Sequence, residues 1–321
     1  MNSRTGRRTF LRAAGMIAGS ALTAGIPFSR ASAAPTSKPQ KFLVGFAPAT
    51  DGTLDNYWMR MEALSKTGLR HIEVDNTFIK IAENYGSRPS EFRERMMKLK
   101  LRLVGVNQSY RFADSSQAPA IKEQNTLVGK FLRDVGAIYL GWEGPLATGT
   151  GDEQVEREDE MRQIARLANE EGKRLREEYG IRFTYHTHST LGFRRLMDLT
   201  RPNDLSLNPD LGWLLARGGG DAMEICRAYR SRIQTLHFKD FDPDRTYTDR
   251  GRPGKGGMVV PGKGKVDFPA VVEFLKETEF EGCVLGEHIG LGNYDYVRSP
   301  REVEIYPQYK EYFTGTLGLK V

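Results

Sequence analysis

The sequence predicts one α/β domain with the architecture of a (β/α)8 barrel. Hydrophobic runs bounded by turn residues recur about every 30 to 40 residues, and segments with helical periodicity lie between them. Polar groups also gather at the ends of the last four runs. Eight strands alternating with helices in one domain are typical of this barrel. A doubly wound open sheet is the alternative, but no G-x-G-x-x-G follows the first run to support it.

The eight predicted strands are short and mostly apolar, as expected for strands buried in a parallel sheet. In chain order they are Phe42–Phe46, Leu69–Asp75, Leu103–Asn107, Ala137–Gly141, Phe183–His186, Leu205–Asn208, Ile233–His237 and Cys283–Glu287. Parallel neighbours need long crossovers, which are usually helices. The sequence therefore has room for a helix after nearly every strand.

Two of the crossovers carry clear helix signals. One is a stripe of small or apolar residues at helical spacing in a charged segment: Met161, Ile164, Ala165, Ala168, Gly172, Leu175 and Tyr179. The other spans 268–277, with Asp267 placed to cap it and Pro269 in its first turn. Segment 240–265 is long and rich in Gly, Asp, Arg and Lys. We expect it to be a lid loop that ends in a turn at 262–265 before the helix cap.

The N-terminus predicts export. Arg7 and Arg8 form a twin-arginine pair, followed by a weakly apolar stretch and by Ala31-Ser32-Ala33, an A-x-A-like cleavage site. We expect a signal peptide at 1–33, a linker at 34–40, the barrel at 41–315 and a C-terminal tail at 316–321. The twin-arginine export machinery is then a partner, and the mature protein is periplasmic or secreted. No later stretch approaches the roughly 18 apolar residues of a membrane span.

The charge of the chain argues against nucleic-acid binding, and its two cysteines indicate free thiols. The full chain carries +6, but residues 1–33 contain five arginines and no acid, so the remainder is close to neutral. Nucleic-acid binding needs a clustered basic face, which this remainder lacks. Cys226 and Cys283 lie in different predicted elements with apolar neighbours, which favours two buried free thiols over a disulfide.

Metal-binding side chains end four successive predicted strands. They are His186 with His188 two residues on, then Asp210, His237 and Glu287. Active sites of this barrel lie at the carboxyl ends of the strands. Imidazole and carboxylate together suit Mn, Zn or Co better than Ca or Mg. The pattern predicts one bound divalent metal ion, with His186 and His188 as alternative first ligands.

Strand alternation places further candidates near this site. His186 and His188 share one face of a strand, as do His237 and Lys239. The lysine is therefore expected to face the metal, where it stabilises developing negative charge or binds an anionic group, unless it is an ordinary surface lysine. Glu73 and Glu143 end the second and fourth strands, where they either contact a substrate and move protons or form ordinary rim salt bridges. Three more residues are substrate contacts or plain core and rim residues: Asn107, Trp142 and Trp213.

Five motifs carry a resemblance to a known family: Tyr185-His-Thr-His188, Pro209-Asp-Leu-Gly-Trp213, His237-Phe-Lys-Asp-Phe241, Gly262-Lys-Gly-Lys-Val-Asp-Phe268 and Gly286-Glu-His-Ile-Gly290. The sequence over about 40 to 315 resembles the xylose isomerase-like barrel superfamily, in its sugar phosphate isomerase/epimerase branch. That branch also includes inosose dehydratases and ketose 3-epimerases. The resemblance implies one divalent metal, often Mn, held by a strand-five histidine, Asp210, His237 and Glu287.

One departure from that family bears on mechanism. Ketose epimerases carry Glu at the first ligand position, where this chain has His186, so one of their two carboxylate bases is missing here. The resemblance implies a metal-dependent isomerase or epimerase that acts through an enolate on a sugar or keto-sugar, with Glu287 or Glu143 moving the proton. Because phosphorylated intermediates are usually cytoplasmic, the predicted export favours a non-phosphorylated substrate. Two alternatives stay open. One is a lyase, dehydratase or hydrolase acting on keto-sugars or 3-keto-glycosides, and the other is a non-catalytic periplasmic carbohydrate-binding protein. The sequence leaves the oligomeric state open, a homo-oligomer included.

Overall fold

The computed structural model describes residues 38–321, apart from positions 76, 113, 145, 147–156, 188–191, 219–220, 250, 295 and 297–298. The chain divides into two units, 1–36 and 37–321, and the second is described here by itself. The predicted signal peptide, most of the predicted linker and His188 thus lie outside the described residues. No helix in the described part of the chain is long and apolar enough to cross a membrane.

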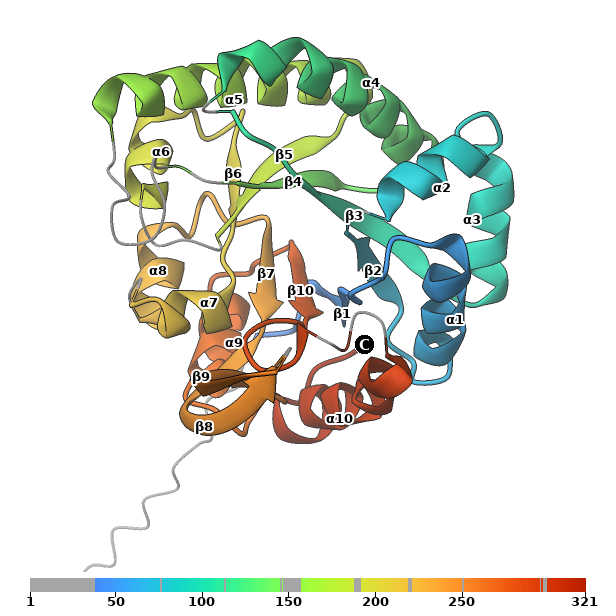
Figure 1. Ribbon diagram of the computed structural model, residues 1–321, viewed down its shortest axis with the longest axis vertical. Coiled ribbons are helices and arrows are strands. Elements are labelled where there is room, and N and C mark those ends of the chain that lie inside the picture. The colour runs from blue at the N-terminus through green and yellow to red at the C-terminus, as the bar shows by residue number, and fades with distance from the viewer. Residues whose placement is uncertain are drawn as a thin grey trace, which may run out of the picture. The chain divides into compact units, whose positions relative to one another are not determined.

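Eight parallel strands form the wall of the barrel (Figure 1). They are β1 Leu43–Phe46, β2 His71–Val74, β3 Arg102–Ser109, β4 Tyr139–Glu143, β5 Arg182–His186, β6 Ser206–Asn208, β7 Thr235–Phe238 and β10 Cys283–Gly286. Their order in the sheet is β6-β5-β4-β3-β2-β1-β10-β7. Isolated parallel bridges Leu207–Ile233 and Asp210–His237 link the two edge strands. The sheet is therefore nearly closed, and the predicted (β/α)8 barrel is confirmed.

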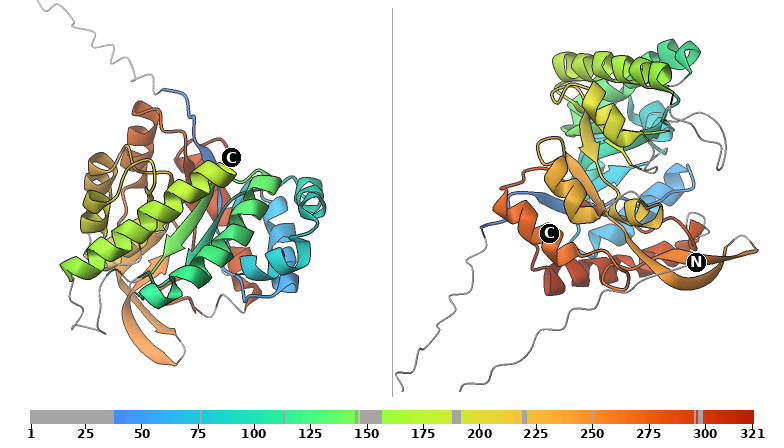
Figure 2. Two further views of the ribbon diagram at one scale, coloured as in Figure 1. Left: turned by 90° about the horizontal axis from the view of Figure 1, so that it is seen from above. Right: turned by 90° about the vertical axis from the view of Figure 1, so that its left-hand side faces the viewer.

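Helices surround the strands as a ring (Figures 1 and 2). They are α1 Leu54–Ser65, α2 Phe78–Tyr85, α3 Pro89–Lys98, α4 Ala118–Val135, α5 Glu158–Tyr179, α6 Phe193–Leu199, α7 Leu211–Ala216, α8 Ala222–Ala228, α9 Phe268–Glu277 and α10 Tyr306–Glu311. Both predicted helices are present. The small and apolar stripe of α5 is buried from Met161 to Leu175, and Asp267 caps α9 by accepting from the amide of Ala270 at 3.1 Å.

Strand alternation separates the core into two layers. Outward-facing residues pack against the helices, as where the Phe238 ring lies 4.7 Å from that of Phe268 in α9. A small cluster of Val104, Tyr139, Cys283 and Leu285 forms a second apolar core. Both cysteines are buried and free. Strand residues that face away from the helices therefore point into the barrel. Some of them form this cluster, and others, nearer the carboxyl ends of the strands, form the polar site described below.

Segment 240–265 is not the loop that its composition suggests. It forms an antiparallel ribbon, β8 Asp240–Asp249 and β9 Arg252–Val259, which extends away from the barrel in Figure 2. The Asp240 carboxylate anchors the return of the chain, because it accepts from the amides of Gly262 at 2.9 Å and Gly264 at 2.8 Å. The sequence did not predict this hairpin, because its high glycine content is unfavourable in strands.

The C-terminal residues pack onto the barrel. A 3-10 turn, η4 Pro300–Glu304, precedes α10, and a π-helical turn, η5 Tyr312–Thr316, follows it. Leu317 and Leu319 of the predicted tail are buried. The Glu302 carboxylate pairs with Arg60 of α1 and accepts from the amide of Ala49, whose segment lies at the barrel mouth. The chain end thus supports one wall of the mouth.

Candidate metal centre

Four predicted ligand residues meet at the carboxyl ends of the strands. His186 ends β5, Asp210 follows β6, His237 lies in β7, and Glu287 follows β10. One ligand atom from each lies within 4.8 Å of the other three, and all four residues are buried. The His186 Nε2 atom lies 3.8 Å from Asp210 Oδ2, and the two imidazole rings are 4.4 Å apart.

This arrangement fits a single divalent ion. Ligand atoms about 2.1 Å from an ion lie roughly 3.0 to 4.2 Å from one another in tetrahedral or octahedral shells. One oxygen of Asp210, Oδ1, accepts from the amide of Trp213 at 2.9 Å and so caps α7. The other, Oδ2, is buried and faces the cluster, where the Lys239 ammonium lies 3.0 Å away. A buried, inward-facing carboxylate oxygen that takes no part in the helix cap suits a metal ligand.

His237 lies between two carboxylates. Its Nδ1 atom is 2.5 Å from Glu287 Oε2, and its Nε2 atom is 3.0 Å from Glu73 Oε1. Burial opposes the charged ring, but the negative charges of Glu73 and Glu287 outweigh it and raise the pKa of His237 to about 10. Both ring nitrogens of His237 therefore face a carboxylate, Nε2 that of Glu73 in β2 and Nδ1 that of Glu287 after β10.

Lys239 is part of the same cluster. Its Nζ atom lies 3.0 Å from Asp210 Oδ2 and 2.9 Å from Glu287 Oε1, and the side chain is only 1% exposed. Burial works against its charge, yet the two carboxylates raise the pKa of Lys239 above its usual range. Burial likewise works against the Glu287 carboxylate, while Lys239 and His237 hold its pKa well below its usual range. At neutral pH the cluster thus contains a fixed ammonium and ionised Glu287.

A cavity of about 140 Å³ opens onto the cluster. Its described lining is Ala47, Pro48, Ala49, Glu73, Asp75, Asn107, Glu143, His186, His237, Glu287 and Ile289. This lining contains four carboxylates and no lysine or arginine. Glu143 accepts from the hydroxyl of Ser109 at 2.6 Å, and the buried Oδ1 of Asn107 has no hydrogen-bond donor among the described atoms. The cavity is therefore polar and suited to hydroxyl groups.

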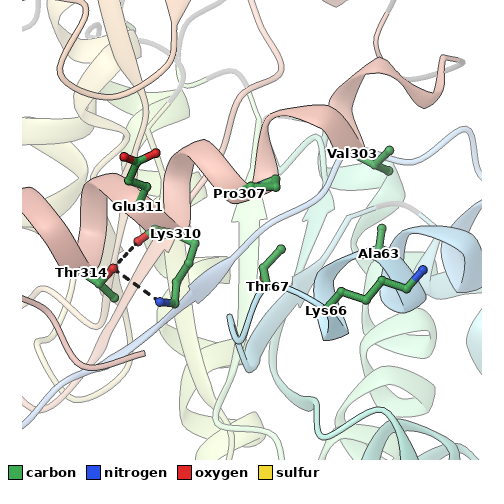
Figure 3. Close-up of a pocket in the computed structure, with 8 residues that line it drawn as sticks. All are labelled: Ala63, Lys66, Thr67, Val303, Pro307, Lys310, Glu311 and Thr314. Atoms are coloured by element: carbon green, nitrogen blue, oxygen red, sulfur yellow. Dashed lines mark hydrogen bonds between the residues drawn. The ribbon is translucent and has the colours of Figure 1, made fainter.

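A larger groove of about 550 Å³ lies elsewhere, between α1 and the C-terminal helix (Figure 3). Its lining includes Lys66, Thr67, Lys310 and Thr314, and the Lys310 ammonium donates to Thr314 Oγ1 at 3.4 Å. None of the four described metal-ligand candidates lines it. The larger volume of this groove therefore does not identify it as the functional site. The small cavity at the strand ends is lined by side chains that can bind a metal and move protons.

Of the remaining predicted site residues, some line the cavity and others do not. Glu73, Asn107 and Glu143 line the cavity. Trp142 is buried, its ring packs 4.9 Å from that of Tyr185, and it is absent from the described lining of the cavity. Trp213 is buried with Phe241 and Met258 at the base of the ribbon and is absent from the described lining.

Sequence reasoning missed three residues near the site. Asp75 lines the cavity and accepts from the Thr50 hydroxyl at 2.8 Å, and its burial raises its pKa. Tyr139 donates to Glu73 Oε2 at 2.6 Å, and Ser109 holds Glu143. Strand alternation contained the signal for two of them: Asp75 lies two residues beyond Glu73, and Tyr139 lies four before Glu143, each on the same face.

Comparisons with known proteins agree with this geometry. A protein-family model, the xylose isomerase-like TIM barrel, matches residues 61–302. Inosose dehydratase from Lacticaseibacillus casei is 29% identical over 195 residues, which cover 54% of this chain and 63% of that protein. The matched region thus spans less than two thirds of this relative.

Solved structures show the same fold at low identity. The IolI protein with a binding zinc atom is 20% identical, with a TM-score of 0.63 over 86% of this chain and 98% of that one. D-psicose 3-epimerase with D-tagatose, from Clostridium cellulolyticum H10, is 14% identical, with a TM-score of 0.63 over 86% and 99%. Because the family model covers most of the barrel, the chain belongs to the xylose isomerase-like TIM barrel family.

Proposed function

We propose that this protein is a divalent-metal-dependent enzyme that moves a proton on a non-phosphorylated sugar or keto-sugar, as an isomerase or epimerase does. The observation that carries the proposal is the buried cluster of His186, Asp210, His237 and Glu287 beside a polar cavity. The inosose dehydratase and 3-epimerase neighbours support a carbohydrate substrate. Manganese is the ion we expect, with zinc or cobalt as alternatives, and the IolI neighbour, whose structure holds a zinc atom, supports a bound divalent metal.

The four cluster residues would hold the ion, which when bound supplies a positive charge that polarises a substrate carbonyl or hydroxyl. Glu143 on the cavity wall is the proposed base, and it removes a proton from the carbon next to the carbonyl. Lys239 stabilises the negative charge of the enolate that results. Glu287 is the alternative base, although its contacts with His237 and Lys239 favour a ligand role.

The charge of the cavity supports a neutral substrate. Its described lining contains the carboxylates of Glu73, Asp75, Glu143 and Glu287 but no lysine or arginine. Phosphate recognition in proteins relies on arginine, lysine or clustered amides. A sugar phosphate would meet repulsion from this wall, whereas hydroxyl groups would find acceptors.

β-Elimination is the second candidate, and two observations favour it. Relatives matched by sequence include inosose dehydratases, and the resemblance to ketose epimerases implies that His186 takes the place of one of their two carboxylate bases. A dehydratase or other lyase acting on a keto-sugar, or on a 3-keto-glycoside, uses the same initial proton removal and then expels a leaving group. Hydrolysis of a keto-glycoside belongs to the same group of alternatives.

Solvent deuterium exchange tests the proposal. Neutral keto-sugars, inososes and 3-keto-glycosides are incubated in D2O with the protein and Mn²⁺, Zn²⁺ or Co²⁺, and followed by NMR. We expect metal-dependent uptake of deuterium next to the carbonyl, which Asp210→Ala abolishes; loss of water or of an aglycone would identify the lyase or hydrolase. A sugar that binds but undergoes neither exchange nor conversion would instead support the non-catalytic binding protein.

A further inference from the structure

We propose that Glu73 is a positioning residue for the metal centre: with Tyr139 behind it, Glu73 holds the proton of His237 on Nε2, so that Nδ1 is the nitrogen that faces the metal. This inference rests on the metal site of the proposed function. It also replaces the predicted substrate-binding role of Glu73 with one that acts through His237.

The position of His237 between two carboxylates carries the argument. A neutral imidazole has one lone pair for a metal, and its other nitrogen keeps a proton that needs an acceptor. Nδ1 lies 2.5 Å from Glu287, itself a proposed ligand, so this nitrogen is on the metal side of the ring. Nε2 lies 3.0 Å from Glu73 Oε1. The carboxylate of Glu73 is thus the acceptor within reach of the nitrogen that keeps the proton.

The contact between His237 Nε2 and Glu73 Oε1 is close, but its angle is poor for a hydrogen bond. Nε2 is buried and completes no hydrogen bond of good geometry with a described atom, although Glu73 Oε1 is at hydrogen-bond distance. A small rotation of the ring aligns the N–H with Oε1. Metal ligation of Nδ1 favours such an adjustment, because it fixes the ring and leaves Nε2–H as the donor.

Glu73 is itself held in place. It is buried in β2, and its Oε2 accepts from the Tyr139 hydroxyl at 2.6 Å, which leaves Oε1 for His237. The Tyr139 ring fits only because β3 has glycine beside it: a Cβ on Gly105 would lie 2.2 Å from the ring. Four strands therefore contribute to one chain of contacts, from Gly105 through Tyr139 and Glu73 to His237.

Such outer carboxylates affect metal affinity measurably. Removing the partner of a metal-bound histidine typically costs 10- to 100-fold in affinity while the ligand set stays the same. A direct ligand behaves differently, since its loss changes both stoichiometry and coordination. A substrate-contacting Glu73 would leave metal affinity unchanged. The three roles of Glu73 thus predict three different results.

The experiment measures metal affinity by chelator competition in the full-length protein and in Glu73→Gln and Tyr139→Phe. We expect one metal ion per chain in both variants, about 10- to 100-fold weaker binding for Glu73→Gln and a smaller loss for Tyr139→Phe. The visible absorption bands of the Co²⁺ protein should keep their pattern. Glu171→Gln is the matched control: Glu171 is also buried but pairs with Arg174 on α5, so its change should leave affinity unaltered.

NMR gives a readout that a purely structural role of Glu73 would not affect. In the zinc-loaded protein, we expect the His237 proton on Nε2 at low field, and its signal should move upfield in Glu73→Gln. A proton on Nδ1 overturns the proposal. This spectrum of the unmodified protein, together with Tyr139→Phe, remains decisive if Glu73→Gln does not fold.

Two other results also overturn the inference. Unchanged affinity in both variants means that Glu73 does not position His237, and loss of the bound ion with altered Co²⁺ bands in Glu73→Gln makes Glu73 a ligand. Asp210→Ala separates this failure from failure of the metal site. If Asp210→Ala keeps its metal, the proposed site is wrong; if it loses the metal while Glu73→Gln is unaffected, only the present inference falls.

Discussion

Lys239 is the residue whose position best separates an enzyme from a binding protein. A buried ammonium is costly unless it is paired, and Lys239 lies within 3.0 Å of carboxylate oxygens of both Asp210 and Glu287. A fixed positive charge of this kind stabilises negative charge that develops during a reaction more than it helps a neutral ground state. A carbohydrate-binding site that only holds hydroxyl groups has little use for it.

Replacing Lys239 by Met should therefore lower kcat by about 100-fold or more while changing KM by less than about threefold. The side chain keeps its length and apolar stem but loses its charge. Steady-state kinetics on whichever keto-sugar shows metal-dependent exchange provides the measurement, with metal content checked in parallel. Lys255→Met, at a lysine whose side chain is 70% exposed on β9, is the control and should leave both constants unchanged. An effect of Lys239→Met on KM alone would count against proton transfer assisted by this lysine.

At the scale of single residues, the sequence predicted which side chains lie at the rim, because strand periodicity determines this. The side chains that meet at one rim lie at or just after the carboxyl ends of strands, as the barrel requires: His186, Asp210, His237 and Glu287. Side-chain partners were not predictable in the same way. Nothing in the local sequence indicates that Tyr139 donates to Glu73, because the pair joins β4 to β2 across the barrel interior.

The β8–β9 ribbon depends on one buried carboxylate. Asp240 accepts from the amides of Phe241, Gly262, Gly264 and Val266, and these bonds tie the start of the ribbon to the segment that follows it. Trp213, Phe241 and Met258 pack together at its base. Isolated two-stranded hairpins are marginal in water, so this anchor decides whether the ribbon is ordered.

Asp240→Ala should lower the free energy of unfolding by on the order of 3 kcal/mol, since it leaves several amides without an acceptor. Asp240→Asn keeps one acceptor oxygen and should cost less. Chemical denaturation followed by circular dichroism measures both. Asp244→Ala is the matched control, because the Asp244 side chain is 77% exposed on the same ribbon, and its effect should stay within about 0.5 kcal/mol. Equal effects of Asp240→Ala and Asp244→Ala would refute the anchor.

Elements with a regular period were predictable, and the ribbon was not. The stripe in α5 and the cap of α9 depend only on residues close together in the sequence, so they could be recognised directly. The ribbon forms because of contacts distant in sequence, such as the amide of Met258 donating to Leu291 at 2.8 Å. The outward direction of Trp142 was predictable from alternation, since its neighbour Glu143 lines the cavity and adjacent strand residues face opposite sides.

For the whole molecule, we propose that the twin-arginine route exports the folded protein to the periplasm or beyond. Export of a folded chain agrees with a metal site that only the closed barrel assembles. Replacing Arg7 and Arg8 by lysine should retain the precursor in the cytoplasm, because the lysine ammonium does not reproduce the guanidinium pair. Cell fractionation and immunoblotting measure the distribution, with Arg4→Lys as the control outside the pair. Unaltered export of the double variant would exclude this route.

We propose that one metal ion joins four strands at the mouth of the barrel. Anomalous diffraction from crystals grown with Mn²⁺, with data collected on both sides of the manganese edge, locates such an ion. We expect a single strong peak within coordination distance of His186, Asp210, His237 and Glu287, and no peak there in crystals of Asp210→Ala. A fully occupied peak elsewhere in the chain, or none in metal-saturated crystals, would contradict it.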